Sequence, residues 1–508
     1  MRSRPFATAF AIVGWTSALP TLAAPSDAML QKLLERVEKL ESRNAQLEKE
    51  VQALKREKEM ATEERSTERS PEREPAERPS GREPEIAARL EAVEKDVQAM
   101  KKPAALAEKL DGIAVDAALT TVWQNATGLP HGTEGAENKL NYRADITVEV
   151  PLEEVGMIEQ KLFAHVRIGQ GEGLNGSLGL LGHFGVPNAA AFKASGANAD
   201  DSVAILGEAW YQAGISFGED KKHRLEATLG KMDTFGFFDQ NEAAGDEATQ
   251  FLNAAFVHNP LLDAGGEVGV DANGFQPGVV LSYLNETNGA EPWRLSLGAF
   301  GAGSEGSNYQ KTGDSPLMIA QVEKTLKLFG GHDGNYRLYA WSRSHDVPHP
   351  HFTHDDFSSR HTGFGLSFDQ QFGRGVKLFG RYGHLTSGKM PFDRAAVLGA
   401  EINGAYWGRA ADAVGIAGAW LRASKAYKRA GGEGFLSTDH YDDHVENGAP
   451  ADFTFRPSGA EQTAELYYRV YLTPNLSLTP DVQWTRHSGA NPRADDVTTI
   501  GLRANVSY

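Results

Sequence analysis

The stretch 497-VTTIGLRANVSY-508 alternates apolar and polar side chains and ends on an aromatic residue. In an extended chain, Ile500, Leu502 and Val506 fall on one face, whereas Arg503 and Asn505 fall on the other. An apolar exterior and a polar interior suit a β-barrel in lipid, because closure of the sheet satisfies every backbone hydrogen-bonding group. A half-buried strand of a soluble sandwich shows the same alternation, so the rest of the chain must decide between the two.

The same two-residue period recurs from about residue 111 to residue 508. It predicts sixteen strands, at about residues 113–124, 138–150, 159–169, 207–217, 223–231, 276–284, 292–300, 317–329, 335–344, 361–370, 376–385, 396–405, 412–421, 462–472, 476–486 and 497–508. Every second connection is short and most of the others are long, an arrangement typical of outer-membrane barrels. We therefore predict an all-β fold, a 16-stranded antiparallel transmembrane β-barrel over residues 111–508.

The N-terminus has the pattern of a secretory signal peptide. Arg2 and Arg4 precede an apolar stretch over residues 5–19, and the small residues Ala23 and Ala24 predict cleavage that leaves residues 1–24 as the signal. No later apolar run reaches about 18 residues, so we expect no transmembrane helix. The chain has no cysteine, which excludes disulfides, thiol catalysis and thiolate metal sites.

Residues 25–60 carry a heptad pattern. The repeat positions, three and four residues apart, are Leu30, Leu33, Val37, Leu40, Asn44, Leu47, Val51 and Leu54. They predict a coiled coil with a register-fixing asparagine, although a single amphipathic helix on a globular domain is the alternative. A charged, Pro-rich linker follows at 61–84, and a second short helix or coiled coil at 85–110. This coiled-coil helix segment precedes the barrel. Because the number of strands is even, both chain ends lie on the side of the short turns, so the segment would stand in the periplasm.

The charge distribution and the missing motifs narrow the classes of function. The net charge of −17 lies entirely on residues 111–508, because residues 1–110 carry 20 basic and 20 acidic side chains. An acidic barrel disfavours nucleic acid as a partner and suits neutral or cationic solutes. No Ser-His-Asp order, phosphate-binding glycine loop or carboxylate pair stands out, so we expect neither an enzyme nor a cofactor.

One group of side chains leaves a metal site as an alternative. It consists of His345, His349, His351, His354 and His361, with Asp346, Asp355 and Asp356. Such a group could bind zinc or copper. Without thiolates or a fixed scaffold we favour a hydrophilic external loop, and we predict no metal ligands.

Several long motifs in the barrel segment allow comparison with known families. They are Glu208-Ala209-Trp210-Tyr211, Gly230-Lys231-Met232-Asp233, the segment from Phe237 to Pro260, Gly334-Asn335-Tyr336-Arg337-Leu338-Tyr339, Ala464-Glu465-Leu466-Tyr467-Tyr468 and Gly501-Leu502-Arg503. Over about residues 112–508 the chain resembles the carbohydrate-selective porins, the OprB family. The resemblance implies a sixteen-stranded outer-membrane channel for sugars. The coiled coil and the linker are additions to the minimal family pattern.

The resemblance and the heptads disagree on the oligomer. Porin resemblance implies a trimer, whereas valine at position a with leucine at position d of the heptads favours two strands. We expect a homo-oligomer in the outer membrane of a Gram-negative cell, and we favour the trimer because the barrel offers the larger interface.

Strict alternation on each strand assigns the residues that face the channel. The predicted channel-lining or substrate-binding residues are Arg224, Glu226, Arg294, Arg337, Tyr339, Trp341, Arg343, Arg381, Glu465, Tyr467, Arg469 and Arg503. Aromatic rings suit the C–H faces of sugars, and charged groups suit their hydroxyls. The alternative is that these residues only keep a water-filled barrel wet and pair across it. A one-residue bulge would reverse the assignment on its strand.

Two long connections, at about 170–206 and 232–275, are rich in Ala, Phe and Leu. We therefore expect at least one of them to fold inward and narrow the pore. The second contains Asp233, Asp239, Asn241 and Glu242, which could bind solute hydroxyls at a constriction. Alternatively, these side chains cap short helices and hold the loop in place.

The sequence thus favours a porin for passive diffusion of carbohydrates and other small hydrophilic solutes. The alternative is a general or cation-leaning porin whose periplasmic coiled coil tethers the outer membrane to a cell-wall or periplasmic partner. A barrel enzyme is the third hypothesis, and it requires a catalytic constellation that the sequence does not show.

Overall fold

The computed structural model describes residues 112–128, 138–175, 178, 183–192, 201–262, 274–301, 316–343, 360–433 and 457–508. The signal peptide, the coiled coil, the linker and the second helix predicted from the sequence lie outside these residues. The same holds for His345, His349, His351 and His354 of the histidine group. These four predictions and the histidine loop therefore stay predictions.

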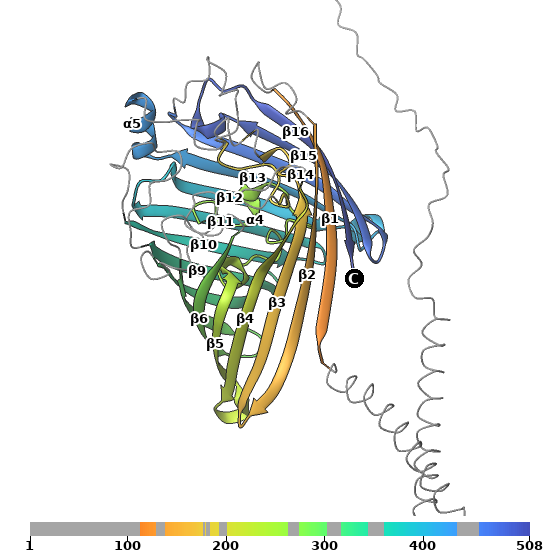
Figure 1. The fold of residues 1–508 in the computed structure, drawn as a ribbon, viewed down its shortest axis with the longest axis vertical. Helices are drawn as coiled ribbons and strands as arrows, with labels where there is room; N and C mark the ends of the chain where they lie inside the picture. The colour runs from red at the N-terminus through yellow and green to blue at the C-terminus, as the bar shows by residue number, and fades with distance from the viewer. Residues whose placement is uncertain are drawn as a thin grey trace, which may run out of the picture. The chain divides into compact units, whose positions relative to one another are not determined.

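The described part of the chain forms a closed barrel of antiparallel strands (Figure 1). The strands are β1 (Ala114–Thr127), β2 (Asn138–Val155), β3 (Ile158–Gln170), β4 (Val203–Phe217), β5 (His223–Asp233), β6 (Phe275–Asn285), β7 (Trp293–Phe300), β8 (Leu317–Leu328), β9 (His332–Arg343), β10 (His361–Phe372), β11 (Val376–Ser387), β12 (Phe392–Asn403), β13 (Ala413–Ala423), β14 (Ala460–Thr473), β15 (Leu476–Arg486) and β16 (Val497–Ser507). The prediction of a 16-stranded barrel is confirmed, and the largest shift of a strand end is at β2, which runs to Val155.

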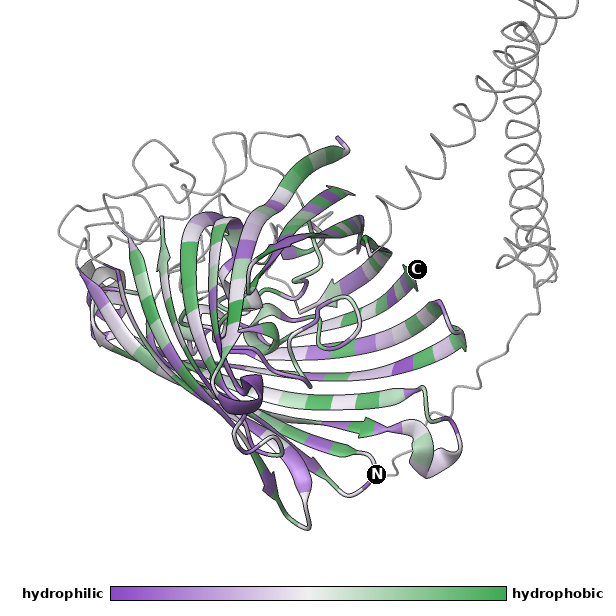
Figure 2. Cartoon of the chain, turned by 90° about the horizontal axis from the view of Figure 1, so that it is seen from below, coloured by the Kyte–Doolittle hydropathy of each residue, from purple (hydrophilic) through white to green (hydrophobic). Residues whose placement is uncertain are grey.

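Side chains alternate between the two faces of the wall, as β16 illustrates. Leu502 is 44% exposed and pairs with the outward Trp123, whereas Arg503 is 2% exposed and pairs with the inward Val122. Figure 2 shows the same alternation of apolar and polar residues along the other strands. The pairing of β16 with β1 leaves the sheet without a free edge, so the exposed apolar band can face hydrocarbon while backbone groups stay bonded.

Connections differ in length at the two ends of the barrel. The links after β2, β10 and β14 span only residues 156–157, 373–375 and 474–475. At the other end, the links after β3 and β5 span residues 171–202 and 234–274, although the link after β11 has only residues 388–391. The predicted alternation therefore holds with one exception.

Short helices lie only in the connections among the described residues. They are η1 (Glu219–Lys221), η2 (Thr234–Gly236), α4 (Ala254–Val257), η5 (Gly404–Trp407), α5 (Lys425–Glu433) and η6 (Ser488–Ala490). None of these helices is long and apolar enough to cross a membrane. Asn253 caps α4 and Asp233 caps η2, each by accepting a backbone N–H two residues ahead.

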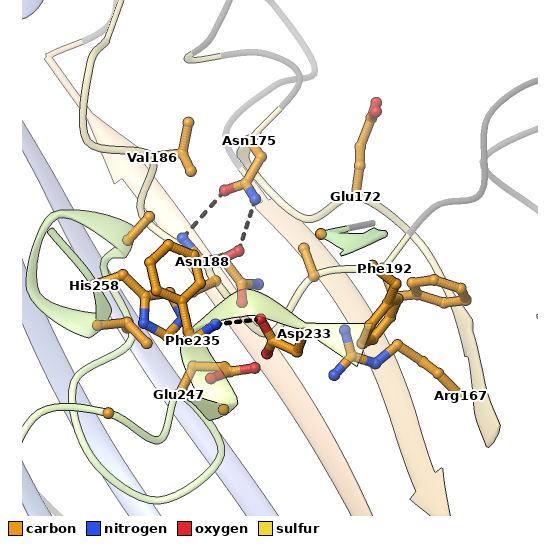
Figure 3. Close-up of a pocket in the computed structure, with 18 residues that line it drawn as sticks. Arg167, Glu172, Asn175, Val186, Asn188, Phe192, Asp233, Phe235, Glu247 and His258 are labelled. Carbon is orange, nitrogen blue, oxygen red and sulfur yellow. Dashed lines mark hydrogen bonds between the residues drawn. The ribbon is translucent and has the colours of Figure 1, made fainter. Parts of the chain in front are cut away.

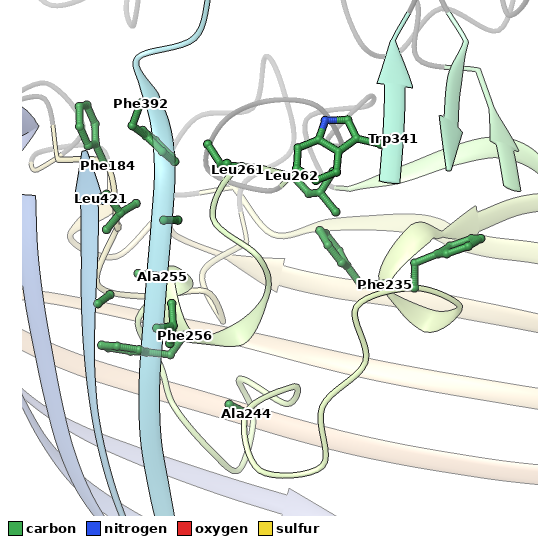
Figure 4. Packing of buried hydrophobic residues seen from close by; sticks show 14 of the residues in the cluster. Phe184, Phe235, Ala244, Ala255, Phe256, Leu261, Leu262, Trp341, Phe392 and Leu421 are labelled. Carbon is green, nitrogen blue, oxygen red and sulfur yellow. The ribbon is translucent and has the colours of Figure 1, made fainter. Parts of the chain in front are cut away.

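The hydrophobic core lies inside the barrel, around the link between β5 and β6. We call residues 171–202 the first inner loop and residues 234–274 the second inner loop. Phe238, Phe251 and Phe256 of the second inner loop are fully buried, and they belong to one cluster with Phe379 and Trp341 of the wall. Figure 4 shows residues of this cluster, including Phe256 and Trp341, together with Phe184 from the first inner loop. The expectation that at least one long loop folds inward is confirmed.

Candidate functional site: the passage past the inner loops

The second inner loop is bonded to one side of the wall through a buried ion pair. The Arg381 guanidinium of β11 donates from Nε to Asp239 Oδ2 at 3.0 Å, and neither side chain is exposed. Tyr339 of β9 donates its hydroxyl to Asp239 Oδ1 at 2.7 Å. Arg381 also donates to the backbone carbonyl of Phe256 at 2.6 Å. Burial raises the pKa of Asp239, and the charge of Arg381 offsets part of that rise.

Strands β14 and β16, further along the same closed wall, hold the same loop through its backbone. Glu465 of β14 accepts N–H groups of Leu252 and Asn253 at 2.7 and 2.8 Å. Arg503 of β16 donates to the carbonyls of Glu247 and Gln250, both at 2.7 Å. The second inner loop therefore leaves β5, crosses the interior and is fixed to β9, β11, β14 and β16.

Several residues predicted to line the channel lie on the inner wall but beneath this loop. The buried ones are Arg337, Tyr339, Trp341, Arg343, Arg381, Glu465, Tyr467 and Arg503. Trp341 packs in the apolar cluster, and the Tyr467 ring lies 5.0 Å from that of Phe251. Arg469 is partly buried and donates to the carbonyl of Thr249 at 2.6 Å. All of these side chains face inward. Tyr339, Arg381, Glu465, Arg469 and Arg503 bond to the loop, and Trp341 and Tyr467 pack with it, whereas Arg337 pairs with Glu323 and Asp369 of the wall.

Three other predicted residues form an ion-pair ladder that the inner loops do not cover. Glu226 of β5 pairs with Arg224 at 2.8 Å and with Arg294 of β7 at 2.9 Å. Arg224 reaches further to Glu159 of β3 at 2.6 Å. All four side chains keep some exposure, so this ladder remains a candidate for contact with solutes.

The four polar residues predicted for the constriction divide between two roles. Asp239 holds the loop, and Asn241 does so too because its amide donates to the carbonyl of Phe368 at 2.9 Å. Glu242 is exposed and pairs with Lys377 at 2.8 Å, an attraction that lowers its pKa against the opposing effect of burial. Asp233 caps η2 and also borders the cavity described next. All four residues thus cap a helix or bond the loop to the wall, Glu242 through Lys377 and Asn335.

A cavity of about 600 Å³ remains open between the two inner loops and the wall (Figure 3). We call it the chamber. Arg167 of β3, Asp233 of β5 and Phe275 of β6 line its wall side, and Asn188 belongs to the first inner loop. The second inner loop contributes Phe235, Glu247 and His258. The rings of Phe235 and His258 stack with their centroids 3.7 Å apart.

Charged groups around the chamber form a connected network. Arg143 bridges Asp145 of its own strand at 2.7 Å and Glu247 of the second inner loop at 2.8 Å. Asp145 also pairs with Arg167 and His165 of β3, at 2.7 and 2.8 Å. Burial alone would raise the pKa of Glu247, but the attraction of Arg143 and Arg167 lowers it overall. The carboxylate of Glu247 therefore stays charged beside the chamber.

In contrast to Glu247, the side chain of His258 is kept neutral by its surroundings. Burial lowers its pKa to about 3, so the imidazole is neutral near pH 7. Besides His258, the ionisable groups that line the chamber are Glu172, Asp233, Glu247 and Arg167. The chamber thus offers carboxylates and amides for hydroxyl groups and flat rings for apolar faces.

The network of Arg143, Asp145, His165 and Arg167 was not among the residues predicted from the sequence. Its signal was available, because residues 143 and 145 on β2 and residues 165 and 167 on β3 lie two apart on inward faces. Among the described residues, no group of three or more His, Cys, Asp or Glu side chains is placed to hold a metal ion.

Comparisons with known proteins agree with this architecture. A family model described as "Carbohydrate-selective porin, OprB family" matches residues 140–508. The high-pH structure of Pseudomonas putida OprB matches with a TM-score of 0.61 and 17% identity, over 79% of this chain and 96% of that chain. A mutant porin of Rh. blastica matches with a TM-score of 0.39 and 10% identity, over 78% of this chain and 100% of that chain. A search of curated proteins found no match.

Proposed function

Because the chain belongs to the carbohydrate-selective porin family OprB, we propose that it is an outer-membrane porin for passive diffusion of carbohydrates and other small hydrophilic solutes. The observation that carries the proposal is the chamber within a closed barrel, bordered by two inner loops and a charged wall. A channel of this kind needs no turnover, because selectivity follows from the width and the lining of the pore.

The lining of the chamber supports sugars as its solutes. A sugar has C–H faces that pack on rings such as Phe235, and hydroxyl edges that hydrogen-bond to carboxylates such as Asp233. Arg167 lies over the ring of Phe275 at 5.1 Å, which fixes its guanidinium at the wall. Elsewhere on the wall, the ladder of Arg224, Glu226 and Arg294 offers a second polar surface.

Planar bilayers test this proposal directly. The purified full chain is added to a bilayer, and single-channel current is followed while a monosaccharide is titrated. We expect stepwise conductance that the sugar attenuates in a saturable way. No conductance steps would refute the channel, and steps that no sugar attenuates would reduce the protein to a general porin.

The oligomeric state and the role of the N-terminal segments are two further proposals. We propose a trimer by analogy with the porins, and cross-linking in intact outer membranes would test it against the dimer that the heptads favour. The periplasmic tether is tested by deletion of residues 25–110. Unchanged solute flux with a weakened envelope attachment would support a tether, whereas an unchanged envelope would argue against it.

A further inference from the structure

Two glutamates of β14 bind the inner loops by their backbone. Glu461 and Glu465 are four residues apart, face the interior and are 0% and 2% exposed. Glu461 accepts the N–H groups of Phe184, Gly185 and Gly489, each at 2.8 Å. Glu465 accepts those of Leu252 and Asn253. Five loop N–H groups therefore depend on two carboxylates of a single strand.

The loops held by these glutamates are also bonded to each other. Ala254 donates its N–H to the carbonyl of Val186 at 3.0 Å, and Ala189 donates to that of Leu252 at 2.7 Å. The Asn253 amide adds bonds to the carbonyl of Gly185 at 3.3 Å and to Gln483 of β15 at 2.9 Å. Both inner loops border the chamber, so a shift of either one changes its width.

We propose that Glu461 and Glu465 are positioning residues that lock the two inner loops and residues 487–490 into one unit and thereby set the width of the passage. This inference rests on the proposed channel function. A carboxylate suits the task because both of its oxygens accept hydrogen bonds. A glutamine in the same place turns an NH2 group toward backbone N–H donors, which leaves buried donors unpaired.

The first test compares Glu461→Gln and Glu465→Gln with the unaltered full chain in planar bilayers. We expect each variant to raise the mean single-channel conductance by about twofold and to increase the current noise, because pore width sets conduction. Glu219→Gln is the matched control, since Glu219 is an exposed glutamate of η1 in the short link between β4 and β5. We expect its noise to stay at the level of the unaltered chain.

A second variant reaches the same junction without altering a carboxyl group. A Cβ added at Gly185 would lie 2.9 Å from Ala255 Cβ, so Gly185→Ala forces the two inner loops apart. Gly459→Ala is its control, because a Cβ there meets nothing within 4 Å. Before these measurements, the folded form of each variant is identified by its mobility on a gel, which changes when the sample is heated.

The outcomes distinguish a failure of the proposed channel function from a failure of the proposed positioning role. An unaltered chain without conductance refutes the channel itself. A conducting chain whose folded Glu461→Gln and Gly185→Ala variants keep its conductance and noise overturns the positioning role. Increased noise in Gly185→Ala supports the role even if both glutamine variants fail to fold.

Discussion

Arg381 and Asp239 form an ion pair at 3.0 Å in which both side chains are wholly buried, although they lie 142 positions apart in sequence. The pair joins β11 to the middle of the second inner loop. Arg381 also donates to the carbonyls of Asp239 and Phe256, so one guanidinium holds three acceptors. Replacing either Arg381 or Asp239 alone is costly, because the remaining side chain would be a buried charge without its partner.

We predict that Asp239→Ala destabilises the docked second inner loop by about 3–5 kcal/mol, the usual cost of leaving a buried charge unpaired. Hydrogen exchange of peptides covering residues 252–261 provides the measurement, and we expect much faster exchange. The control is Glu242→Gln, which removes the exposed ion pair with Lys377 and is expected to cost about 0–1 kcal/mol. Equal exchange in both variants would contradict this assignment.

Protonation of two buried histidines is predicted to weaken the docking of the inner loops at low pH. Burial lowers the pKa of His183 from 6.5 to about 4 and that of His258 to about 3. An opened loop binds protons near pH 6.5 whereas the docked loop does not, so docking loses stability as the pH falls from 6.5 toward 4. We expect increasing hydrogen exchange in both loops over this range. His183→Asn should remove part of the dependence in the first inner loop, and an unchanged pH profile would exclude His183 as its source.

A ring in the chamber is predicted to set sugar affinity. Phe235→Ala removes the surface that stacks on His258 and lines the chamber. We expect the sugar concentration for half-maximal block to rise by roughly 2- to 10-fold, since an aromatic contact contributes about 0.5–1.5 kcal/mol. Titration of single-channel current with a monosaccharide measures it. Phe364→Ala, on the outer face, is the control, and equal block in the two variants would remove Phe235 from the site.

The outer face is predicted to tolerate charge only near its rim. Leu502 lies at the middle of β16, whereas Val506 lies near its end, and both are exposed. Leu502→Arg is expected to cost about 2–4 kcal/mol and Val506→Arg about 0–1 kcal/mol, because the penalty for a charge depends on depth in the bilayer. Urea unfolding from lipid vesicles measures both values. A larger cost at Val506 would reverse the depth assigned to this strand.

The barrel was predictable from sequence because its signal is local. The two-residue period marks each strand, and Leu502 and Arg503 reveal the two faces without knowledge of their partners. Bulges could have reversed the faces, but the irregularity in β14 lies beyond Tyr471, after the residues assigned there. The predicted inward orientation therefore holds for Glu465 and Tyr467.

What covers those inward residues was not predictable. Tyr339 and Asp239 are 100 positions apart, and Arg503 donates to the carbonyl of Glu247 across 256 positions. An inward arginine facing water and one clamped to a loop carbonyl have the same sequence pattern. Only the path of the second inner loop distinguishes them, and no local period encodes that path.

The junction between β1 and β16 also constrains how the protein is made. Ala118 pairs with Ser507, and Ala117 and Tyr508 exchange backbone hydrogen bonds. The two strands that pair here are therefore separated by most of the barrel sequence. Contacts between residues so far apart in sequence form slowly during folding. Until the last strand has been synthesised and delivered, β1 presents an unpaired edge that invites aggregation. The pairing of β16 with β1 therefore ends the period in which the unfinished barrel can aggregate through that edge.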